Sequence, residues 1–317
     1  MKNSVLVTGG CGFLGTTLVE QLLQRFDELN LEKITIFDSL ALKDDGCLPL
    51  LRDKRVDLVV GDVRNRDLFK SLIQSHNVIY PLAAIVGMPA CKKKEDEAWS
   101  VNHTQINDIS LLAGTDAKVI YPNTNSIYGQ SNTPVDEKSN IKCLSTYAKS
   151  KWRAEQMVLD EIAGISLRLA TLAGLSYRFR KDLLVNSMVL NALNPGYVIL
   201  YEPDFQRNYI SVRDAARAFI HSLVNYDSMK GQCYNTGNTK LNCSKMQLAQ
   251  KIKEYVPNFV INVEPFAKDP DARSYVVLND KLESTGFKCE DDFDTIIPQL
   301  ISGYKVILEC SSQYTNL

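Results

Sequence analysis

Residues 4–15 read Ser-Val-Leu-Val-Thr-Gly-Gly-Cys-Gly-Phe-Leu-Gly, a short apolar run followed by glycines at positions 9, 12 and 15. The run predicts a buried strand over Ser4–Val7, and the amphipathic stretch Thr16–Phe26 predicts a helix directly after the glycines. Glycines permit a tight turn and a close backbone approach, and the N–H groups at a helix amino terminus can bind a pyrophosphate. The stretch therefore predicts a dinucleotide site formed by Gly9, Gly12, Phe13, Leu14 and Gly15.

A carboxylate at the end of the next apolar run specifies the dinucleotide further. Asp38 closes the run Lys33–Phe37, roughly 20 residues after the glycines, where a carboxylate can bind both ribose hydroxyls of an adenosine and repel a 2′-phosphate. We therefore expect NAD rather than NADP. The other residues expected beside this cofactor follow three apolar runs and are Ser39, Asp62, Val63, Leu82, Ala83 and Ala84. For Asp62 the alternative is a helix cap.

Short apolar runs alternate with amphipathic stretches through the first half of the chain. Strands are predicted over Ser4–Val7, Lys33–Phe37, Val56–Val60, Asn77–Pro81, Lys118–Tyr121 and Ile165–Leu169, and further helices over Arg66–Ser75 and Tyr147–Leu159. The runs are continuously apolar, as expected for strands covered by helices on both faces. The pattern predicts an α/β protein with a Rossmann-type, doubly wound parallel sheet.

The pattern loosens beyond Gly174 into pieces punctuated by proline and glycine. We expect an NAD-binding domain over residues 1–174 and a smaller substrate-binding lobe over residues 175–317. Helices in this lobe are predicted over Asp182–Leu193, Val212–Val224 and Ser244–Tyr255. Residues 208–211 and 232–236 resemble strands that return to the first domain, so the C-terminal lobe is expected to be interleaved with it.

Tyr147 and Lys151 lie four residues apart on a predicted helix, so their side chains emerge from one face and can converge on one substrate hydroxyl. A phenol ordinarily has a pKa near ~10, and a nearby ammonium favours the phenolate that can act as a base. Together with Thr124 upstream, the pair predicts a site for hydride-transfer chemistry. The alternative is an exposed tyrosine and lysine on a surface helix.

With these elements assembled, the chain resembles the extended short-chain dehydrogenase/reductases, specifically the NAD-dependent sugar-nucleotide epimerase/dehydratase family. The matching stretches include TGGCGFLG at 8–15, GDV at 61–63, NTNSIYG at 123–129, YAKSK at 147–151 and RNYISVRDAARAF at 207–219. The resemblance implies that Tyr147 removes a proton from the carbon-4 hydroxyl of a sugar while hydride passes to the nicotinamide. It also implies that Thr124 hydrogen-bonds the same oxygen and that Lys151 holds the nicotinamide ribose.

The two residues after Thr124 are Asn125 and Ser126, and they discriminate between the chemistries of the family. The resemblance implies an acidic residue at the second position in 4,6-dehydratases and a cysteine there in 3,5-epimerases, and serine is neither. A 4-epimerase is therefore the leading hypothesis. A 4-dehydrogenase that releases a 4-keto sugar is the alternative, and residues 83–91 and 121–126 resemble a subgroup that includes nucleotide-heptose, possibly GDP-heptose, 4-oxidation. A cofactor-binding regulator and a dehydrogenase of small alcohols or amino acids are further alternatives.

A nucleotide-diphosphate sugar substrate calls for cations and amides. The resemblance places Arg207 at a phosphate-binding position, and Arg273 is a second candidate, with a surface salt bridge as the alternative for each. Asn186 is expected either at the diphosphate or at a helix cap. Asn125 and Ser126 complete the expected substrate contacts. Cys91 is expected to be a plain thiol, because nothing nearby in the sequence activates it.

The composition sets limits on partners and location. Lys and Arg number 36 against 37 Asp and Glu among 317 residues, which disfavours nucleic acid as a partner. The eight cysteines form no CxxC pair and there are three histidines, which disfavours a metal site and disulfides. No signal peptide or membrane span is predicted, so we expect a cytoplasmic protein. The family resemblance implies a homodimer that pairs through Thr104–Leu112 and Tyr147–Leu159.

Overall fold

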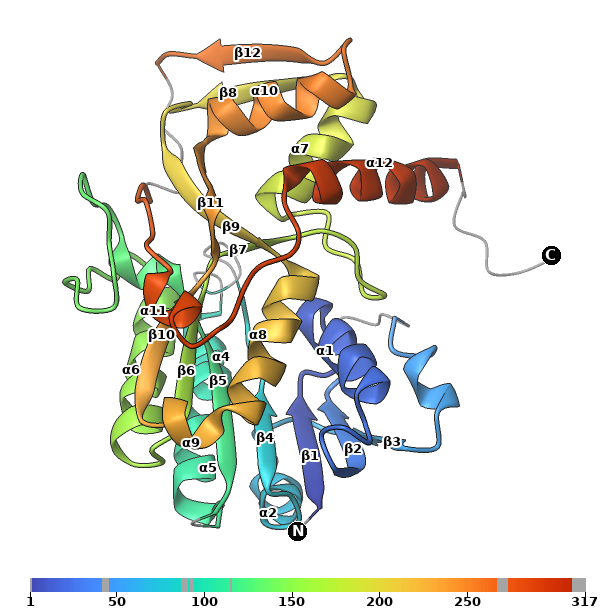
Figure 1. Ribbon diagram of the computed structural model, residues 1–317, viewed down its shortest axis with the longest axis vertical. Helices are drawn as coiled ribbons and strands as arrows, with labels where there is room; N and C mark the ends of the chain where they lie inside the picture. Colours follow the sequence, from blue (N-terminus) through green and yellow to red (C-terminus); the bar gives the residue numbers. More distant parts are fainter. Residues whose placement is uncertain are drawn as a thin grey trace.

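The computed structural model describes residues 2–41, 46–86, 91, 94–114, 116–266 and 273–309. Its largest element is a seven-stranded sheet with the order β10-β6-β5-β4-β1-β2-β3 (Figure 1). The strands are β1 (Asn3–Thr8), β2 (Leu31–Asp38), β3 (Val56–Val60), β4 (Val78–Pro81), β5 (Lys118–Thr124), β6 (Ile165–Leu169) and β10 (Gln232–Thr236). Every pairing is parallel, and the order reverses beside β1. The predicted doubly wound parallel sheet is confirmed.

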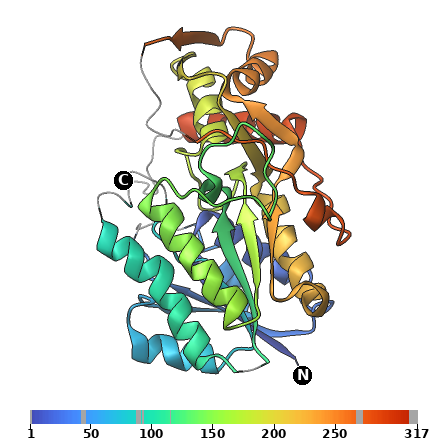
Figure 2. The same ribbon diagram turned by 90° about the vertical axis from the view of Figure 1, so that its left-hand side faces the viewer.

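Helices cover both faces of this sheet (Figure 2). One face carries α1 (Phe13–Gln24) and α8 (Val212–Val224), and the other carries α2 (Arg66–Gln74), α5 (Gln105–Leu112) and α6 (Thr146–Asp160). Alternate residues of a strand point to opposite faces. In β1, Val5 and Val7 accordingly pack in the core under α1 and α8, and Leu6 packs in the core under the other three helices. This two-sided burial explains why the strands are continuously apolar.

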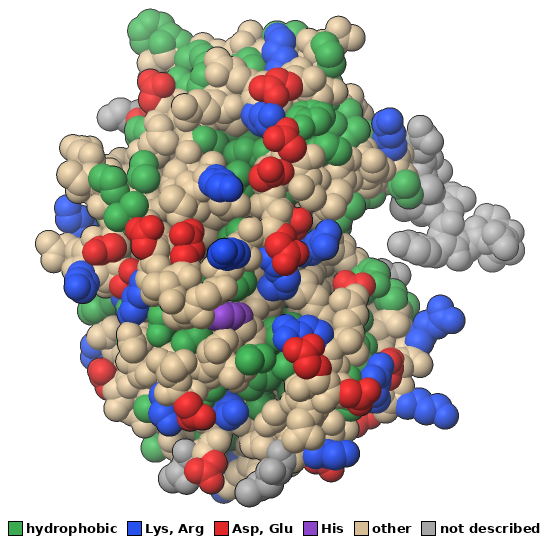
Figure 3. All heavy atoms as spheres, in the orientation of Figure 1, with side chains coloured by type: hydrophobic (Ala, Val, Ile, Leu, Met, Phe, Trp, Pro, Cys, Tyr) green, Lys and Arg blue, Asp and Glu red, His purple; other side chains and the backbone are tan. Residues whose placement is uncertain are grey.

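Shorter helical segments connect these elements. They are η1 (Leu50–Arg52), α4 (Glu95–Trp99), the π-helical η2 (Ser100–Thr104), the 3-10 turn η3 (Asn125–Tyr128), α9 (Tyr226–Met229) and α11 (Asp280–Glu283). Within the described ranges, every helix is too short or too polar to cross a lipid bilayer. Acidic and basic side chains are interspersed over the face drawn in Figure 3, rather than separated by sign.

A second core lies in the C-terminal half of the chain. It packs around α7 (Leu184–Leu193), α10 (Lys245–Tyr255) and α12 (Phe293–Glu309). Two small sheets accompany these helices (Figure 1). One has the order β11-β9-β7 and contains β7 (Thr171–Ala173), β9 (Gln206–Ser211) and β11 (Asn238–Ser244); the other pairs β8 (Tyr197–Tyr201) with β12 (Val260–Glu264).

The two strands expected to return to the first domain join different sheets. Residues 232–236 form β10, which pairs in parallel with β6 at the edge of that sheet. Residues 208–211 lie in β9, which pairs with β11 and with β7, and β7 lies within residues 1–174, the expected first domain. Ser211 caps α8 directly after β9, and this helix packs against α1. The division into two lobes at residue 174 stays a prediction.

The three helices predicted in the C-terminal half begin at or close to the predicted residues. Val212–Val224 is helical as predicted, whereas the helix predicted from Asp182 begins at Leu184. The helix predicted from Ser244 begins one residue later because Ser244 is its cap. The Ser244 hydroxyl accepts from the amide of Gln247, and the side chain of Gln247 accepts from the amide of Ser244, which is a capping box.

Candidate active site

The glycine turn between β1 and α1 is held against the end of β4. Gly9 has a φ of +66°, and a Cβ there would lie 2.7 Å from both Cα and N of Ala83. A Cβ on Gly15 would lie 2.5 Å from the carbonyl oxygen of Gly9. These two positions therefore exclude any larger residue. No side chain caps α1 at Gly12, and its first turn contains no acidic residue, which leaves its amino terminus suited to an anion.

Asp38 lies at the end of β2, beside this turn. Its carboxylate accepts from the amide of Cys11 at 3.1 Å and from the amide of Leu40 at 2.9 Å. These two bonds fix the carboxylate next to the glycine turn, and Ser39 follows it directly. The position is the one expected for a ribose-binding acid, and the uncapped glycine turn beside it fits a dinucleotide diphosphate.

Asp62 and Val63 follow β3 and have different surroundings. Asp62 forms an ion pair with Arg64 at 2.6 Å, which holds the pKa of this carboxyl below its ordinary value. The helix cap is Asn65, whose side chain accepts from the amide of Leu68, so the alternative of Asp62 as the cap was wrong. The side chain of Val63 is buried in the core under α2.

Leu82, Ala83 and Ala84 extend from the end of β4, and buried side chains set the path of this segment. The amide of Ala83 donates to the hydroxyl of Thr8 at 3.1 Å, and that hydroxyl donates to Gln105. Gln105 also donates to the carbonyl of Ala83. Gln105 was absent from the sequence-based site, because a lone glutamine on a helix gives no signal of such a role.

Asn102 fixes the next residue of the same segment. Its carboxamide accepts from the amide of Ile85 at 2.9 Å and donates to the carbonyl of Ile85 at 3.0 Å. It also contacts the hydroxyl of Ser150 on α6 at 3.3 Å. Asn102 therefore joins the segment after β4 to the helix that carries Tyr147 and Lys151.

Thr124, Tyr147 and Lys151 are brought together by β5 and α6. Thr124 is the last residue of β5, and Tyr147 and Lys151 lie on α6, whose cap Ser145 accepts from the amide of Ala148. Tyr147 is partly buried and hydrogen-bonds with Thr124. The three residues named from the sequence therefore share one site, where a threonine hydroxyl and a phenol can address one substrate oxygen.

Tyr147 lies among several charges. Burial and the neighbouring Cys91 raise the pKa of Tyr147 to about 12, whereas Arg273, Arg180 and the hydrogen bond with Thr124 oppose this rise. The two arginines therefore favour the phenolate. Burial raises the pKa of the Cys91 thiol to about 11, so this thiol stays protonated near neutral pH, in line with the expectation of a plain thiol.

Lys151 is only 3% exposed. Its Nζ lies 4.1 Å from the centroid of the Tyr121 ring, and the Tyr121 hydroxyl donates to its carbonyl oxygen at 3.3 Å. Burial lowers the pKa of Lys151 to about 7, and the charge of Glu155 opposes that shift. An ammonium with such a pKa can gain or lose a proton near neutral pH.

Asn125 and Ser126 form the turn after Thr124. The Ser126 hydroxyl accepts from the Thr124 hydroxyl at 2.9 Å and from the guanidinium of Arg273, so Arg273 reaches the same site. Asn125 is 2% exposed, and neither atom of its carboxamide finds a hydrogen-bond partner among the described residues. A buried carboxamide without partners costs about 1–3 kcal/mol per unsatisfied group, which a ligand can relieve.

Asn186 and Arg207 have backbone partners. Both donors of the Asn186 carboxamide are used, by the carbonyls of Gly174 and Arg180, and its oxygen accepts from the amide of Gly174. The residue is fully buried, so it ties the loop after β7 to α7 instead of reaching a diphosphate. It is not the helix cap either, because that position is Leu183. Arg207 is buried, donates to the carbonyl of Gln206 and lies 6.0 Å from the Tyr275 ring.

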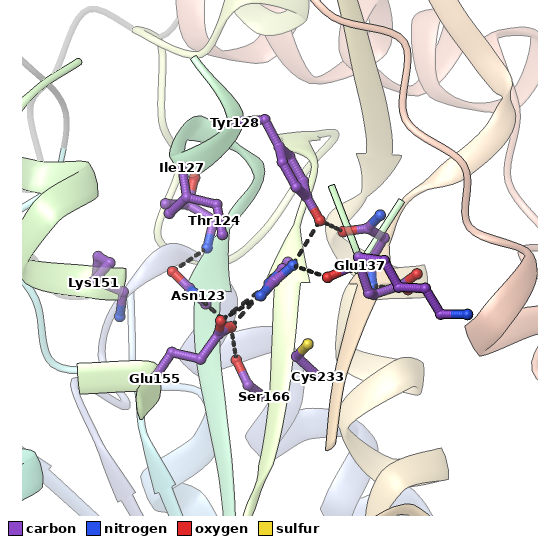
Figure 4. Close-up of polar contacts among 12 residues, drawn as sticks. Asn123, Thr124, Ile127, Tyr128, Glu137, Lys151, Glu155, Ser166 and Cys233 are labelled. Carbon is purple, nitrogen blue, oxygen red and sulfur yellow. Dashed lines mark hydrogen bonds and ion pairs between the residues drawn. The ribbon is translucent and has the colours of Figure 1, made fainter. Parts of the chain in front are cut away.

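A buried polar network lies directly behind the site (Figure 4). Lys151 and Glu155 come from α6, and Asn123 and Thr124 come from β5. Glu155 accepts from Asn123 and Ser166 at 2.6 Å each, and Arg168 donates to it at 2.7 Å. Sequence reasoning missed Glu155, although its place four residues after Lys151 puts it on the same helix face.

A model of the NAD dependent epimerase/dehydratase family matches residues 5–237. The chain belongs to this family. Its members are enzymes that act on sugar nucleotides, and NAD is the cofactor, as the sequence predicted. NAD would be held by the glycine turn with the uncapped start of α1, and by the fixed carboxylate of Asp38.

Relatives within the family differ in the reaction named for them. The protein named "Uncharacterized UDP-glucose epimerase YtcB" from Bacillus subtilis (strain 168) is 24% identical over 74% of this chain and 77% of its own. The dTDP-glucose 4,6-dehydratase DesIV from Streptomyces venezuelae has a TM-score of 0.83 at 22% identity, covering 95% of this chain and 97% of its own. A UDP-glucuronic acid 4-epimerase from Bacillus cereus, in complex with UDP-glucuronic acid and NAD, has a TM-score of 0.81 at 20% identity, covering 95% and 100%. These two likenesses show the fold and leave the reaction open.

Proposed function

We propose that this protein is a nucleotide-sugar 4-epimerase. It oxidises carbon 4 of a sugar attached to a nucleoside diphosphate and returns the hydride to the opposite face of that carbon. The observation that carries the proposal is the pair after Thr124, where the chain has an amide and a hydroxyl, Asn125 and Ser126. Elimination of water, or epimerisation beside the ketone, would need an additional acid or base at this turn. The chemistry therefore stays at carbon 4.

The proposed roles are those that the family resemblance implies, and the hydrogen bond between Tyr147 and Thr124 supports them. Tyr147 removes the proton of the carbon-4 hydroxyl, and Thr124 hydrogen-bonds the same oxygen. Lys151 stabilises the phenolate of Tyr147 with its positive charge. Bound NAD supplies the hydride acceptor. Residues Arg273 and Arg180 support the same step, because their charges oppose the rise in the pKa of Tyr147.

Substrate binding is proposed for three residues near this centre. Asn125 is favoured because its buried carboxamide has no hydrogen-bond partner among the residues that the structure describes and can bind a sugar hydroxyl. Arg273 already contacts Ser126, and Arg207 is buried on β9; a guanidinium suits the oxygens of a diphosphate. Asn186 is left out of this set, because its side chain is engaged by the backbone.

A panel of UDP-, GDP-, CDP- and dTDP-sugars tests the proposal. The purified protein is incubated with each sugar and NAD, and products are identified by mass spectrometry and NMR. A product of unchanged mass that is inverted at carbon 4 is expected. A product that has lost a pair of hydrogens, with accumulating NADH, would identify a 4-dehydrogenase and overturn the epimerase proposal. NADH formed from an alcohol without a nucleotide would point to a different substrate class.

We also propose that the protein is a homodimer that pairs through α5 and α6. The supporting observation is the large apolar side chain of Leu111 on α5, which is 68% exposed, together with Trp99 at 41% in the adjoining α4. Sedimentation at micromolar concentration tests this, with Leu111→Glu as the disruptive variant and the exposed Val263→Glu, on β12 of the C-terminal half, as its matched control. A monomeric parent protein would contradict the proposal.

A further inference from the structure

Glu155 is a fully buried carboxylate that accepts hydrogen bonds from three residues on two strands, β5 and β6. Arg168 on β6 donates to both of its oxygens, with Nη2 at 2.7 Å from Oε1 and Nε at 3.1 Å from Oε2. Asn123 on β5 and Ser166 on β6 donate to Oε2, each at 2.6 Å. Burying a charged carboxylate and guanidinium removes both groups from water at a cost in free energy, so a buried ion pair alone is weak evidence that Glu155 stabilises the fold. The two additional donors, Asn123 and Ser166, therefore need a separate explanation.

One of these donors leads directly to the site. Asn123 donates to Glu155 through Nδ2, and its Oδ1 accepts from the amide of Thr124 at 2.8 Å. The bond to Glu155 thus fixes which way the Asn123 carboxamide faces, because only that orientation gives its nitrogen an acceptor and its oxygen a donor. The backbone of Thr124, and with it the hydroxyl that contacts Ser126 at 2.9 Å, is placed by this relay. Figure 4 shows the sequence of contacts from Glu155 through Asn123 to Thr124.

A second connection runs along α6. Lys151 precedes Glu155 by one helical turn, so the two side chains lie on the same face of the helix. The groups facing Lys151 are the ring of Tyr121 on β5, 4.1 Å from its Nζ, and on its own helix Tyr147 and Glu155. The negative charge of Glu155 stabilises the ammonium form of Lys151 against the cost of burial.

We propose that Glu155 is a positioning residue for the oxidation step, which holds Thr124 through Asn123 and stabilises the charged form of Lys151 from the same carboxylate. This inference rests on the proposed function of Thr124 and Lys151. The inference goes beyond that function because it assigns to one buried carboxylate an effect on both Thr124 and Lys151. Arg168 fixes the carboxylate and continues the network to the hydroxyl of Tyr128 at 2.8 Å, which donates to Asn235 on β10 at 2.6 Å.

The test measures Lys151 directly and needs no turnover. Lysine labelled at Cε with ¹³C is titrated by NMR in the NAD-free protein, and the Lys151 signal is assigned with Lys151→Met. The variant Glu155→Gln removes the charge. The double variant Glu155→Gln with Arg168→Met removes both charges, so that no guanidinium is left buried without its partner. Asp214→Asn is the matched control, because Asp214 is another buried carboxylate paired with an arginine, Arg217, and is remote from α6.

In the parent protein Lys151 is expected to titrate near 7, and in Glu155→Gln its pKa falls further, because the negative charge that opposes the effect of burial is gone. The Thr124 methyl resonance is expected to move in both Glu155 variants and in Asn123→Ala, and to stay in place in Asp214→Asn. A folded Glu155→Gln variant that retains the parent Lys151 titration, or a folded double variant that retains the parent Thr124 resonance, would overturn the inference, because Glu155 would then serve only the ion pair. If the parent titrates as expected and the Glu155 variants shift while no nucleotide sugar is converted, the inference on positioning holds and the proposed reaction fails.

Discussion

The ammonium of Lys151 lies 4.1 Å above the ring of Tyr121, inside the protein. A ring face attracts a cation, but this attraction does not replace lost hydration. The pKa of Lys151 is accordingly lowered from 10.5 to about 7 by burial. The protein therefore maintains a costly charge at the centre of its site, which makes the stability of the fold depend on pH in a predictable way.

Replacing Lys151 with Met should stabilise the NAD-free protein most at low pH. Below about 7 the lysine is charged in both the folded and unfolded chains, so the folded state carries the full cost of the buried charge. Between about 7 and 10.5 only the unfolded chain binds the proton, and parent stability rises with pH. The advantage of Lys151→Met should therefore shrink by about 5 kcal/mol through this window. Urea unfolding across pH checks it; a pH-independent difference would contradict it.

Gly9→Ala should lower the affinity for NAD by about tenfold or more. Its φ of +66° costs an L-residue about 1–2 kcal/mol, and its Cβ would lie 2.7 Å from the backbone of Ala83. The turn must move to relieve this contact. Isothermal titration with NAD measures the change. Gly114→Ala is the control, since a Cβ there meets no described atom within 4 Å, and this variant should bind NAD like the parent.

Tyr147→Phe should abolish sugar oxidation and leave NAD binding intact. The substitution keeps the ring and removes only the group proposed as the base, so the rate should fall by about 10²–10⁴-fold. NADH formation in a single turnover is the measurement. Tyr304→Phe is the matched control, because its hydroxyl donates to the carbonyl of Asn186 in the second core and takes no part in the proposed site. Equal rates in parent and Tyr147→Phe would remove Tyr147 from the mechanism.

Asp38→Ala should weaken the binding of NAD and reduce the preference for NAD over NADP. The carboxylate is fixed by the amides of Cys11 and Leu40, and charged hydrogen bonds contribute about 1.5–3 kcal/mol each, so NAD affinity should fall by roughly 10- to 100-fold. The affinity for NADP should rise relative to that for NAD, because no carboxylate repels the 2′-phosphate in this variant. Dissociation constants for both cofactors decide this, with the exposed Asp57→Ala on β3 as control. An unchanged ratio would show that Asp38 does not select the cofactor.

The parts of this molecule that the sequence predicted are those encoded by local patterns. The glycine turn required by Gly9, the carboxylate of Asp38 at a strand end and the pair Tyr147 and Lys151 on one helix face are each visible within a few residues. The doubly wound parallel sheet was also predictable, because continuously apolar strands that alternate with helices have few alternative arrangements. The family resemblance added the sugar-nucleotide substrate class and the roles of Thr124, Tyr147 and Lys151.

The parts that the sequence did not predict depend on contacts between distant segments. Asn186 could be read as a cap or a phosphate ligand, because nothing nearby reveals that the backbone of Gly174 would fold onto its carboxamide. Residues 208–211 were predicted as a strand, but their pairing with β7 and β11 could not be predicted, because a strand pattern does not specify its partner. Glu155 was not named from the sequence, because its contacts with Asn123 and Arg168 join segments that are far apart in the chain.

A nucleotide sugar carrying deuterium at carbon 4 tests the central claim most directly. Because the proposed reaction removes and returns the hydrogen of that one carbon, the account predicts a 4-epimer of unchanged mass that still carries deuterium at carbon 4, located by NMR. Deuterium found on the nicotinamide of released NADH beside a keto sugar, or at carbon 6 of a dehydrated sugar, would contradict it.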